Sequence, residues 1–247
     1  RGLGDVYKRQ IVHRTMITAG LPESMLAKAI EAWENALPPY LKLAYLPNPG
    51  AVRLRLSAYE VEGESVSKEI ERQFEALRRI IPHNIIGYET ATMQELIHQL
   101  LTERRQTLAT AESCTGGTIA ARFTAMPGAS AYFLCGVVSY SNASKQAVLG
   151  VDPDTIARYG AVSEQVARQM AEGARRISGA DYAVSTTGIA GPAGGTAEKP
   201  VGTVWIAVAG PRRTVALLKQ CGSDRGQIID RAGAFALGLL RDELNGK

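Results

Sequence analysis

Short apolar strands alternate with helical patterns from about residue 107 to the C-terminus. The patterns predict strands at 107–112, 133–140, 181–187, 201–209 and 213–220, and helices up to about 125, near 142–149, after Ser163 and over 226–244. In the helix after Ser163, the residues Val166, Met170, Ala174 and Ile177 form one apolar face. Interleaved strands and helices of this kind predict a layered sheet with helices on both faces. The expected fold class is therefore α/β, in three α/β/α layers.

The preceding part of the chain has a different pattern. Helices are predicted at 22–36 and 65–80, and two strands, at 41–45 and 52–58, are joined by turn residues 47–50. A short strand near 85–87 completes a small α+β unit. A capping box at 92–95 starts a new helix, so we place a domain boundary at about residue 90. Residues 1–10 lack an apolar period and are interpreted as a tail or a cloning remnant, which gives domains at 11–90 and 91–247.

Composition narrows the class of protein. Apolar residues make up 45% and charged residues 21% of the chain, which excludes disorder and a coiled coil. The net charge of +4 is spread without a basic block, so a nucleic-acid partner is not expected. No apolar run reaches the roughly 20 residues of a membrane span. Three isolated cysteines without metal-ligand spacing suit a reducing compartment, and the sequence predicts a cytoplasmic protein without a membrane partner.

The first strand end with candidate chemistry is Ala111–Gly117. A Ser at a strand-to-helix turn, here Ser113, is presented outward, and the N–H groups that follow it can stabilise an anion. A Ser followed by two glycines before a helix is more often a helix cap than a nucleophile. Both interpretations stay open at this point.

The second strand end brings Tyr140, Asn142 and Lys145 to the start of a short helix. Lysine usually lies in solvent. No carboxylate follows Lys145 before Asp152, however, and a lysine without anionic partners can have its pKa lowered by burial and act as a base. We therefore predict a lowered pKa for Lys145.

The third strand end is the glycine-rich stretch 186–195. Its glycines, which include Gly188 and Gly191, permit close approach of the backbone to a phosphate or a ribose. The stretch is not a P-loop, because no GxxxxGK[ST] pattern is present. A simple turn-rich connection explains the composition equally well.

Histidine is absent from residues 107–247, which carry these motifs. His13, His83 and His98 all lie at or before the helix that opens the second segment. A serine hydrolase built from residues 107–247 would therefore lack a local Ser-His-Asp triad and would need another base, for which lysine is the leading choice. An SxxK arrangement is also absent, because position 116 is Gly.

Five motifs in order resemble one known family: AESCTGG at 111–117, GVVSYSNASK at 136–145, YGAVSEQV at 159–166, TTGIAGPAGGTAEKPVGTVW at 186–205 and GSDR at 222–225. They are similar to the CinA C-terminal domain, also called the PncC or nicotinamide-mononucleotide amidohydrolase family. Residues 11–88 resemble the KH-like middle region of full-length CinA. The large molybdopterin-binding-like N-terminal domain of that family has no counterpart here, so a pyrophosphatase activity associated with it is not expected.

The resemblance implies an amidase that converts nicotinamide mononucleotide to nicotinate mononucleotide and ammonia, without a metal or another cofactor. By motif, Ser113 would be the nucleophile, Lys145 the base, and Tyr140 an assisting hydrogen-bond donor. The residues assigned to substrate binding are Thr115, Gly116, Gly117, Asn142, Gly188, Gly191 and Arg225. The backbone N–H groups of residues 115–117 are the candidate oxyanion donors. The family also suggests a homo-oligomer.

A non-catalytic alternative remains. A KH-like segment followed by a nucleotide-binding α/β domain is compatible with a regulatory module that binds nucleotides or nucleic acid. KH recognition depends on a GXXG loop, however, and the first segment contains none.

Overall fold

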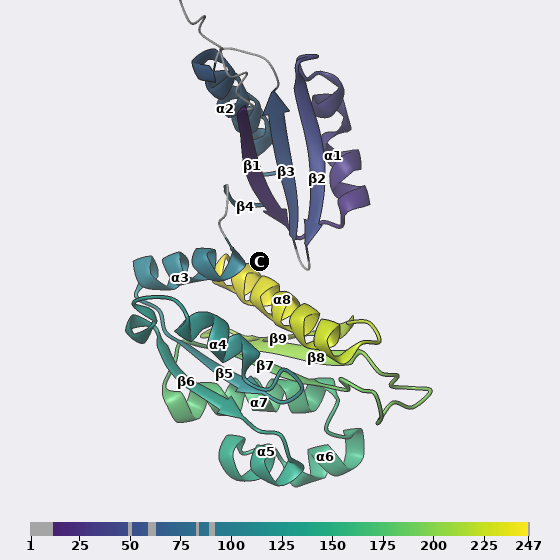
Figure 1. The fold of residues 1–247 in the computed structure, drawn as a ribbon. Coiled ribbons are helices and arrows are strands. Elements are labelled where there is room, and N and C mark those ends of the chain that lie inside the picture. The colour runs from purple at the N-terminus through teal and green to yellow at the C-terminus, as the bar shows by residue number, and fades with distance from the viewer. Residues whose placement is uncertain (1–11, 49–50, 59–62, 83, 89–91, 247) are drawn as a thin grey trace, which may run out of the picture. The chain divides into compact units, whose positions relative to one another are not determined.

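The computed structural model of the chain describes residues 12–48, 51–58, 63–82, 84–88 and 92–246. The chain divides into two compact units, Arg1–Thr92 and Met93–Lys247, whose elements are labelled in Figure 1. Each unit has a hydrophobic core of its own. Within the described ranges, no helix is both long enough and apolar enough to cross a bilayer.

The first unit is a small α+β fold of the KH-like type. It contains β1 (Val12–Ala19), α1 (Glu23–Asn35), β2 (Leu41–Asn48), β3 (Ala51–Ala58), α2 (Gly63–Ile80) and β4 (Ile85–Tyr88). The strands form an antiparallel sheet in the order β2-β3-β1-β4. Apolar residues of α1 and α2 pack with Met16, Leu54 and Leu56 in one core, so both helices cover the same face of the sheet.

Strand β1 is central in this sheet, although the sequence pattern did not predict it. Residues Thr15–Ala19 are all buried, so the strand lacks the apolar–polar alternation that marks β3. The predicted hairpin of β2 and β3 is confirmed by their antiparallel register. Strand β2 extends through Pro47 to Asn48, and the rest of the predicted turn, residues 49–50, lies outside the described residues.

The second unit is an α/β domain. It contains α3 (Met93–Arg104), β5 (Leu108–Glu112), α4 (Thr118–Thr124), the short 3-10 helix η1 (Ala129–Ala131), β6 (Phe133–Val138), α5 (Asn142–Leu149), α6 (Pro153–Tyr159), α7 (Glu164–Ser178), β7 (Tyr182–Gly188), β8 (Thr203–Ala209), β9 (Thr214–Gln220) and α8 (Arg225–Leu244). The sheet has the order β6-β5-β7-β8-β9, in which β6, β5 and β7 are parallel and β8 and β9 are antiparallel.

Helices cover both faces of this sheet, as Figure 1 shows. Helices α3, α4 and α8 contribute to the core on one face, and α5, α6 and α7 pack on the other. The three-layer α/β/α prediction is therefore confirmed. Buried, nearly continuous apolar strands such as β5 are typical of sheets covered on both sides.

Two details of the sequence prediction were wrong in this unit. Helix α6, which starts at Pro153 behind an Asp152 cap, was not predicted, because it has only seven residues and one buried apolar side chain. Ile177 was assigned to the apolar face of α7 with Val166 and Met170, but its side chain is 47% exposed. The burial on α7 ends one turn earlier than its sequence period suggests.

The parallel strands bring the three candidate stretches to one edge of the sheet. In the strand register, Glu112 of β5 pairs with Val138 of β6 on one side and with Thr186 of β7 on the other. The residues that follow each strand therefore emerge next to one another. Open α/β sheets place their sites at this carboxyl edge.

Candidate active site

Ser113 is the first residue after β5, and its side chain is buried. Its N–H donates to the Thr186 carbonyl oxygen at 3.0 Å, which extends the pairing of β5 with β7 by one residue. The chain then turns through Gly116 and Gly117, whose φ angles are +62° and +98°. Only glycine adopts this left-handed backbone without strain, which explains the two glycines at this turn.

The structure excludes Ser113 as the cap of α4. The N-cap residue of this helix is Gly117, and no capping side chain comes from it. The carboxylate of Glu112 takes that role instead, because it accepts hydrogen bonds from the backbone N–H groups of Gly117, Ile119 and Ala120 at 2.9, 3.1 and 2.8 Å. The hydroxyl of Ser113 is therefore left for another interaction.

That interaction is with Lys145. The Nζ atom of Lys145 lies 3.0 Å from the Oγ atom of Ser113 and 2.7 Å from the carbonyl oxygen of Ser139. Lys145 sits in the second turn of α5, which starts with a capping box between Ser141 and Ser144. This cap fixes the first turn of α5, so the lysine side chain projects toward the end of β5.

Burial lowers the pKa of Lys145 from its ordinary value, because desolvation disfavours the ammonium form, and only a weaker contribution from the nearby Cys114 thiol opposes it. The side chain is only 2% exposed. Among the described residues, no carboxylate lies within ion-pair distance of its Nζ atom. The lowered pKa follows the sequence prediction, and a neutral amine beside a hydroxyl is the arrangement that a general base requires.

The turn after Ser113 corrects the predicted oxyanion donors. The N–H of Gly116 already donates to the Ser113 carbonyl oxygen, and that of Gly117 to Glu112, so neither is free in this arrangement. Within the described part of the chain, the N–H groups of Cys114 and Thr115 donate a hydrogen bond to no other residue. Of the three residues assigned by sequence, only Thr115 keeps an available amide.

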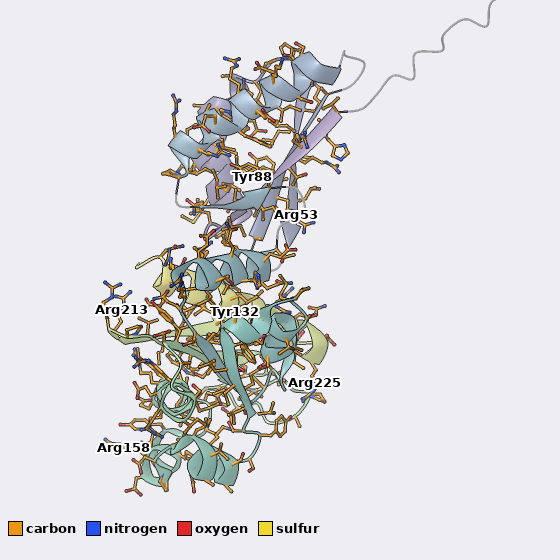
Figure 2. All side chains as sticks on the ribbon, turned by 90° about the vertical axis from the view of Figure 1, so that its left-hand side faces the viewer. Arg53, Tyr88, Tyr132, Arg158, Arg213 and Arg225 are labelled. Atoms are coloured by element: carbon orange, nitrogen blue, oxygen red, sulfur yellow. The ribbon has the colours of Figure 1, made fainter. Side chains whose placement is uncertain are left out.

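Tyr140 and Arg225 form a second part of the same region. Arg225, at the start of α8, donates to the Tyr140 hydroxyl at 3.0 Å and to the Gly191 carbonyl oxygen at 2.7 Å. Both side chains are exposed, and Arg225 is labelled at the surface of its unit in Figure 2. Arg225 thus connects the loop after β6 to the loop after β7. No hydrogen bond joins Tyr140 to Ser113 or Lys145 in the described structure.

The remaining sequence-assigned residues have different surroundings. Asn142 is exposed at the first position of α5, and its side chain has no hydrogen-bond partner among the described residues. Gly188 ends β7, where an added Cβ would lie 2.8 Å from the Thr203 carbonyl oxygen and 2.7 Å from Val204. The absence of a side chain at Gly188 therefore serves the close pairing of β7 with β8.

Two further residues of reactive type, Cys114 and His98, make no hydrogen bond to Ser113 or Lys145 in the described structure. Cys114 is buried, and desolvation raises the pKa of its thiol to about 12, so it is a poor nucleophile near neutral pH. His98 of α3 lies 3.3 Å from the Tyr132 hydroxyl, and the two rings pack edge to face. Across the described residues, no group of three His, Cys, Asp or Glu side chains could hold a metal ion.

Sequence reasoning missed Glu112, Thr186 and Ser139. All three are fully buried, and each holds a part of the turn or the lysine. The sequence offered one signal, which is the acidic residue Glu112 at the end of a strand of otherwise small and apolar residues. A buried carboxylate needs strong hydrogen-bond partners, so an acid at this position indicates a structural role. Nothing in the local sequence marked Thr186 or the Ser139 carbonyl.

Together, these features define an α/β domain with a buried serine–lysine pair at the carboxyl edge of its parallel strands, preceded in the sequence by a small α+β unit. A model of the CinA C-terminal domain matches residues 90–244, and one of the damage-inducible protein CinA KH domain matches residues 13–87. The chain belongs to the CinA family.

Curated relatives agree with this assignment. A CinA-like protein of Flavobacterium psychrophilum is 44% identical over 235 residues, which cover 95% of this chain and 56% of that protein. A CinA-like protein of Cytophaga hutchinsonii is 43% identical over 234 residues, with the same coverage of both chains. The chain thus spans little more than half the length of these relatives.

One solved structure is similar to a large part of this chain. The competence/damage inducible protein CihA of Agrobacterium tumefaciens is 41% identical, with a TM-score of 0.60. The match covers 62% of this chain and 93% of that one.

Proposed function

We propose that the second unit hydrolyses the carboxamide of nicotinamide mononucleotide to nicotinate mononucleotide and ammonia. The observation that carries this proposal is the 3.0 Å contact between Lys145 Nζ and Ser113 Oγ, buried and without a competing carboxylate among the described residues. The nicotinamide nucleotide itself comes from the resemblance of the motifs around these residues. The geometry supports the reaction class, which is acyl transfer through a serine.

The first step uses the neutral form of Lys145. Its nitrogen donates one hydrogen to the Ser139 carbonyl oxygen, which leaves the lone pair to accept the proton of the Ser113 hydroxyl. The Ser113 oxygen then attacks the carboxamide carbon and forms a tetrahedral intermediate. The N–H groups of Cys114 and Thr115 are the donors that we assign to its oxyanion, because they donate a hydrogen bond to no other residue in the described structure.

The second step releases ammonia. The ammonium form of Lys145 returns its proton to the leaving nitrogen as the C–N bond breaks, which produces an acyl-serine and restores the neutral amine. A water molecule then attacks the acyl carbon and gives a proton to Lys145, and the ammonium form of Lys145 passes that proton to the Ser113 oxygen as the acyl–oxygen bond breaks. The Ser113 hydroxyl and the neutral amine are restored, and the carboxylic acid product gives its proton to the released ammonia, so atoms and charges balance over one turnover.

Tyr140 and Arg225 would bind the part of the substrate remote from the carboxamide. Both are exposed, Tyr140 after β6 and Arg225 at the start of α8, and Arg225 supplies a positive charge. A guanidinium is suited to a phosphate group because it can donate two parallel hydrogen bonds. The placement favours an anionic substrate over free nicotinamide.

An ammonia-release assay tests the proposal. The purified chain is given nicotinamide mononucleotide, free nicotinamide or NAD, and Lys145→Ala is assayed in parallel. We expect release from the mononucleotide that depends on Lys145, and much less from nicotinamide. Absence of release from all three, by a folded protein, would overturn the amidase proposal.

The first unit supports a second candidate function, which is contact with single-stranded nucleic acid. The strand register places His13, Lys42, Arg53 and Arg55 on the sheet face opposite to α1 and α2. Strands β1, β2 and β3 contain no acidic residue. Figure 2 labels Arg53 on this sheet. A basic face on strands that carry no acidic residue is suited to phosphates. The binding would differ from KH recognition, because this unit has no GXXG loop.

Binding of a fluorescent single-stranded oligonucleotide at several salt concentrations tests this candidate. The association constant K falls as the salt concentration rises. If Arg53 and Arg55 contact phosphates, each alanine substitution reduces the steepness of the plot of log K against log salt concentration by about 0.7. Equal slopes for wild type and the double variant, or no binding at low salt, would rule the surface out.

A further inference from the structure

A series of buried hydrogen bonds joins Glu112, Thr115 and Thr186, which surround Ser113 in the fold. The hydroxyl of Thr115 donates to Glu112 at 2.6 Å and lies 2.7 Å from the hydroxyl of Thr186. Because each hydroxyl has a single proton, and that of Thr115 goes to the carboxylate, the hydroxyl of Thr186 is the donor to Thr115. Glu112 and Thr186 are 0% exposed and Thr115 is 1% exposed, so water does not compete for these bonds.

These hydrogen bonds fix the backbone on both sides of Ser113. Glu112 immediately precedes Ser113 and ties the first turn of α4 through three backbone N–H groups. Thr186 accepts the Ser113 N–H through its carbonyl oxygen, at 3.0 Å. Thr115 joins these two residues through its hydroxyl. The backbone on which the Ser113 side chain stands is thus fixed to β7 and to α4 at once.

No basic side chain forms an ion pair with Glu112 among the described residues. Its partners are the hydroxyl of Thr115 and the three backbone amides, so the carboxylate fits only one conformation of the turn. Bonds to a charged acceptor inside a protein are stronger than neutral ones. A turn held in this way gives a hydroxyl a defined place relative to its base.

We propose that Glu112, Thr115 and Thr186 are positioning residues that hold the Ser113 hydroxyl at reaction distance from Lys145. This inference rests on the proposed serine–lysine chemistry and adds three side chains that act through Ser113 without touching the reacting atoms, which is a role separate from that of the Thr115 backbone N–H. Small displacements of a nucleophile reduce turnover strongly, and a shift of about 1 Å can cost about 100-fold. Substrate binding, by contrast, involves other parts of the site.

The test compares hydroxyl deletions with a matched control. Thr115→Val and Thr186→Val remove one hydroxyl each at nearly constant volume, and Thr115→Ser restores it. Thr187→Val is the control, because Thr187 is equally buried on the same strand but donates to the Ala161 carbonyl oxygen instead. Glu112→Gln replaces an acceptor by a donor against three N–H groups and endangers the fold, so the threonine variants carry the test.

We expect Thr115→Val and Thr186→Val to lower kcat for nicotinamide mononucleotide by about 10- to 100-fold, with KM within about threefold of wild type. Thr115→Ser should recover kcat to within about threefold. Thr187→Val should lower the melting temperature by a similar amount to Thr186→Val but keep kcat within about threefold. Equal losses of kcat in Thr186→Val and Thr187→Val, or no loss in Thr115→Val, would overturn the inference.

A second readout separates this inference from the choice of substrate. The rate at which a small sulfonyl fluoride labels Ser113, measured by the mass of the intact protein, depends on the serine and its base but not on a nucleotide. Suppose that wild type does not hydrolyse the mononucleotide but is labelled at Ser113, and that Thr115→Val and Thr186→Val are labelled more slowly than wild type and Thr187→Val. The proposed substrate is then wrong, and the positioning role stands. If wild type neither labels nor turns over, both proposals are overturned.

Discussion

Lys145 and Ser113 are 32 positions apart in the chain, yet the Nζ atom of the lysine lies 3.0 Å from the Oγ atom of the serine. The Ser139 carbonyl oxygen holds the same nitrogen from a second direction, at 2.7 Å. The lysine is buried, and among the described residues no carboxylate lies within ion-pair distance of its nitrogen, so the contacts of this nitrogen are a hydroxyl and a carbonyl oxygen.

Removal of the Ser113 hydroxyl should abolish ammonia release. We expect Ser113→Ala to lower kcat by about 1,000-fold or more, since no other side chain can form the acyl intermediate. The melting temperature should change little, because the hydroxyl bonds only to Lys145 in the described structure. Cys114→Ala is the matched control and should retain activity, because burial raises the pKa of the Cys114 thiol to about 12. Turnover by Ser113→Ala would instead point to Cys114 as the nucleophile.

The pH dependence of kcat/KM should follow the loss of the proton from Lys145 in the free enzyme. The neutral amine is the active form, so activity rises with pH through the pKa of Lys145 and is lost as pH falls below it. Burial lowers this pKa, so the rise should occur below the ordinary lysine value of about 10.4. A pH–rate profile in buffers of constant ionic strength measures it. A midpoint near the ordinary value would contradict the assigned base.

Stability should also depend on the protonation of Lys145. A lysine with a lowered folded-state pKa binds its proton more weakly in the folded than in the unfolded protein, so the unfolded state binds more protons at intermediate pH. The stability of wild type relative to Lys145→Met should therefore increase as pH rises from neutral toward about 10.4. Urea unfolding of both proteins at several pH values measures the difference. A difference that stays constant or falls with pH would show that burial of the charge carries no cost.

Tyr140 and Arg225 should act as a pair on substrate binding. Arg225 donates to the Tyr140 hydroxyl at 3.0 Å and also to Gly191. We expect Tyr140→Phe and Arg225→Ala each to raise KM more than they lower kcat, with the double variant less impaired than the sum of the singles. A double-mutant cycle on kcat/KM is the measurement. A large loss of kcat in Tyr140→Phe with unchanged KM would instead favour a direct role for Tyr140 in the chemical step.

Two glycines should respond to alanine in opposite directions. At Gly188 the new Cβ would meet the Thr203 carbonyl oxygen at 2.8 Å and Val204 at 2.7 Å, so Gly188→Ala should destabilise the pairing of β7 with β8. At Gly238, inside α8, nothing lies within 4 Å of the added atom, and Gly238→Ala should raise the free energy of unfolding by about 0.5–1 kcal/mol. Thermal unfolding compares the two, and equal melting temperatures would refute the packing role of Gly188.

The sequence by itself determined the layers and the candidate chemistry. Alternating strands and helices over 107–247 specified the α/β/α arrangement, and the parallel strand ends identified Ser113 and Lys145 as residues to bring together. These features are local, because strand and helix periods record which residues are buried along one element. The period fails where burial runs continuously along an element, as it does from Thr15 to Ala19, which is why strand β1 was missed.

Only the tertiary structure decided how the serine is held and which groups surround it. The Glu112 carboxylate caps α4 and withdraws Gly117 from the predicted oxyanion donors, while Gly188 packs against β8. Thr186 reaches the turn from a strand more than seventy positions away. The physical reason is that hydrogen-bond direction and strand register are set between elements, whereas a sequence pattern describes one element at a time.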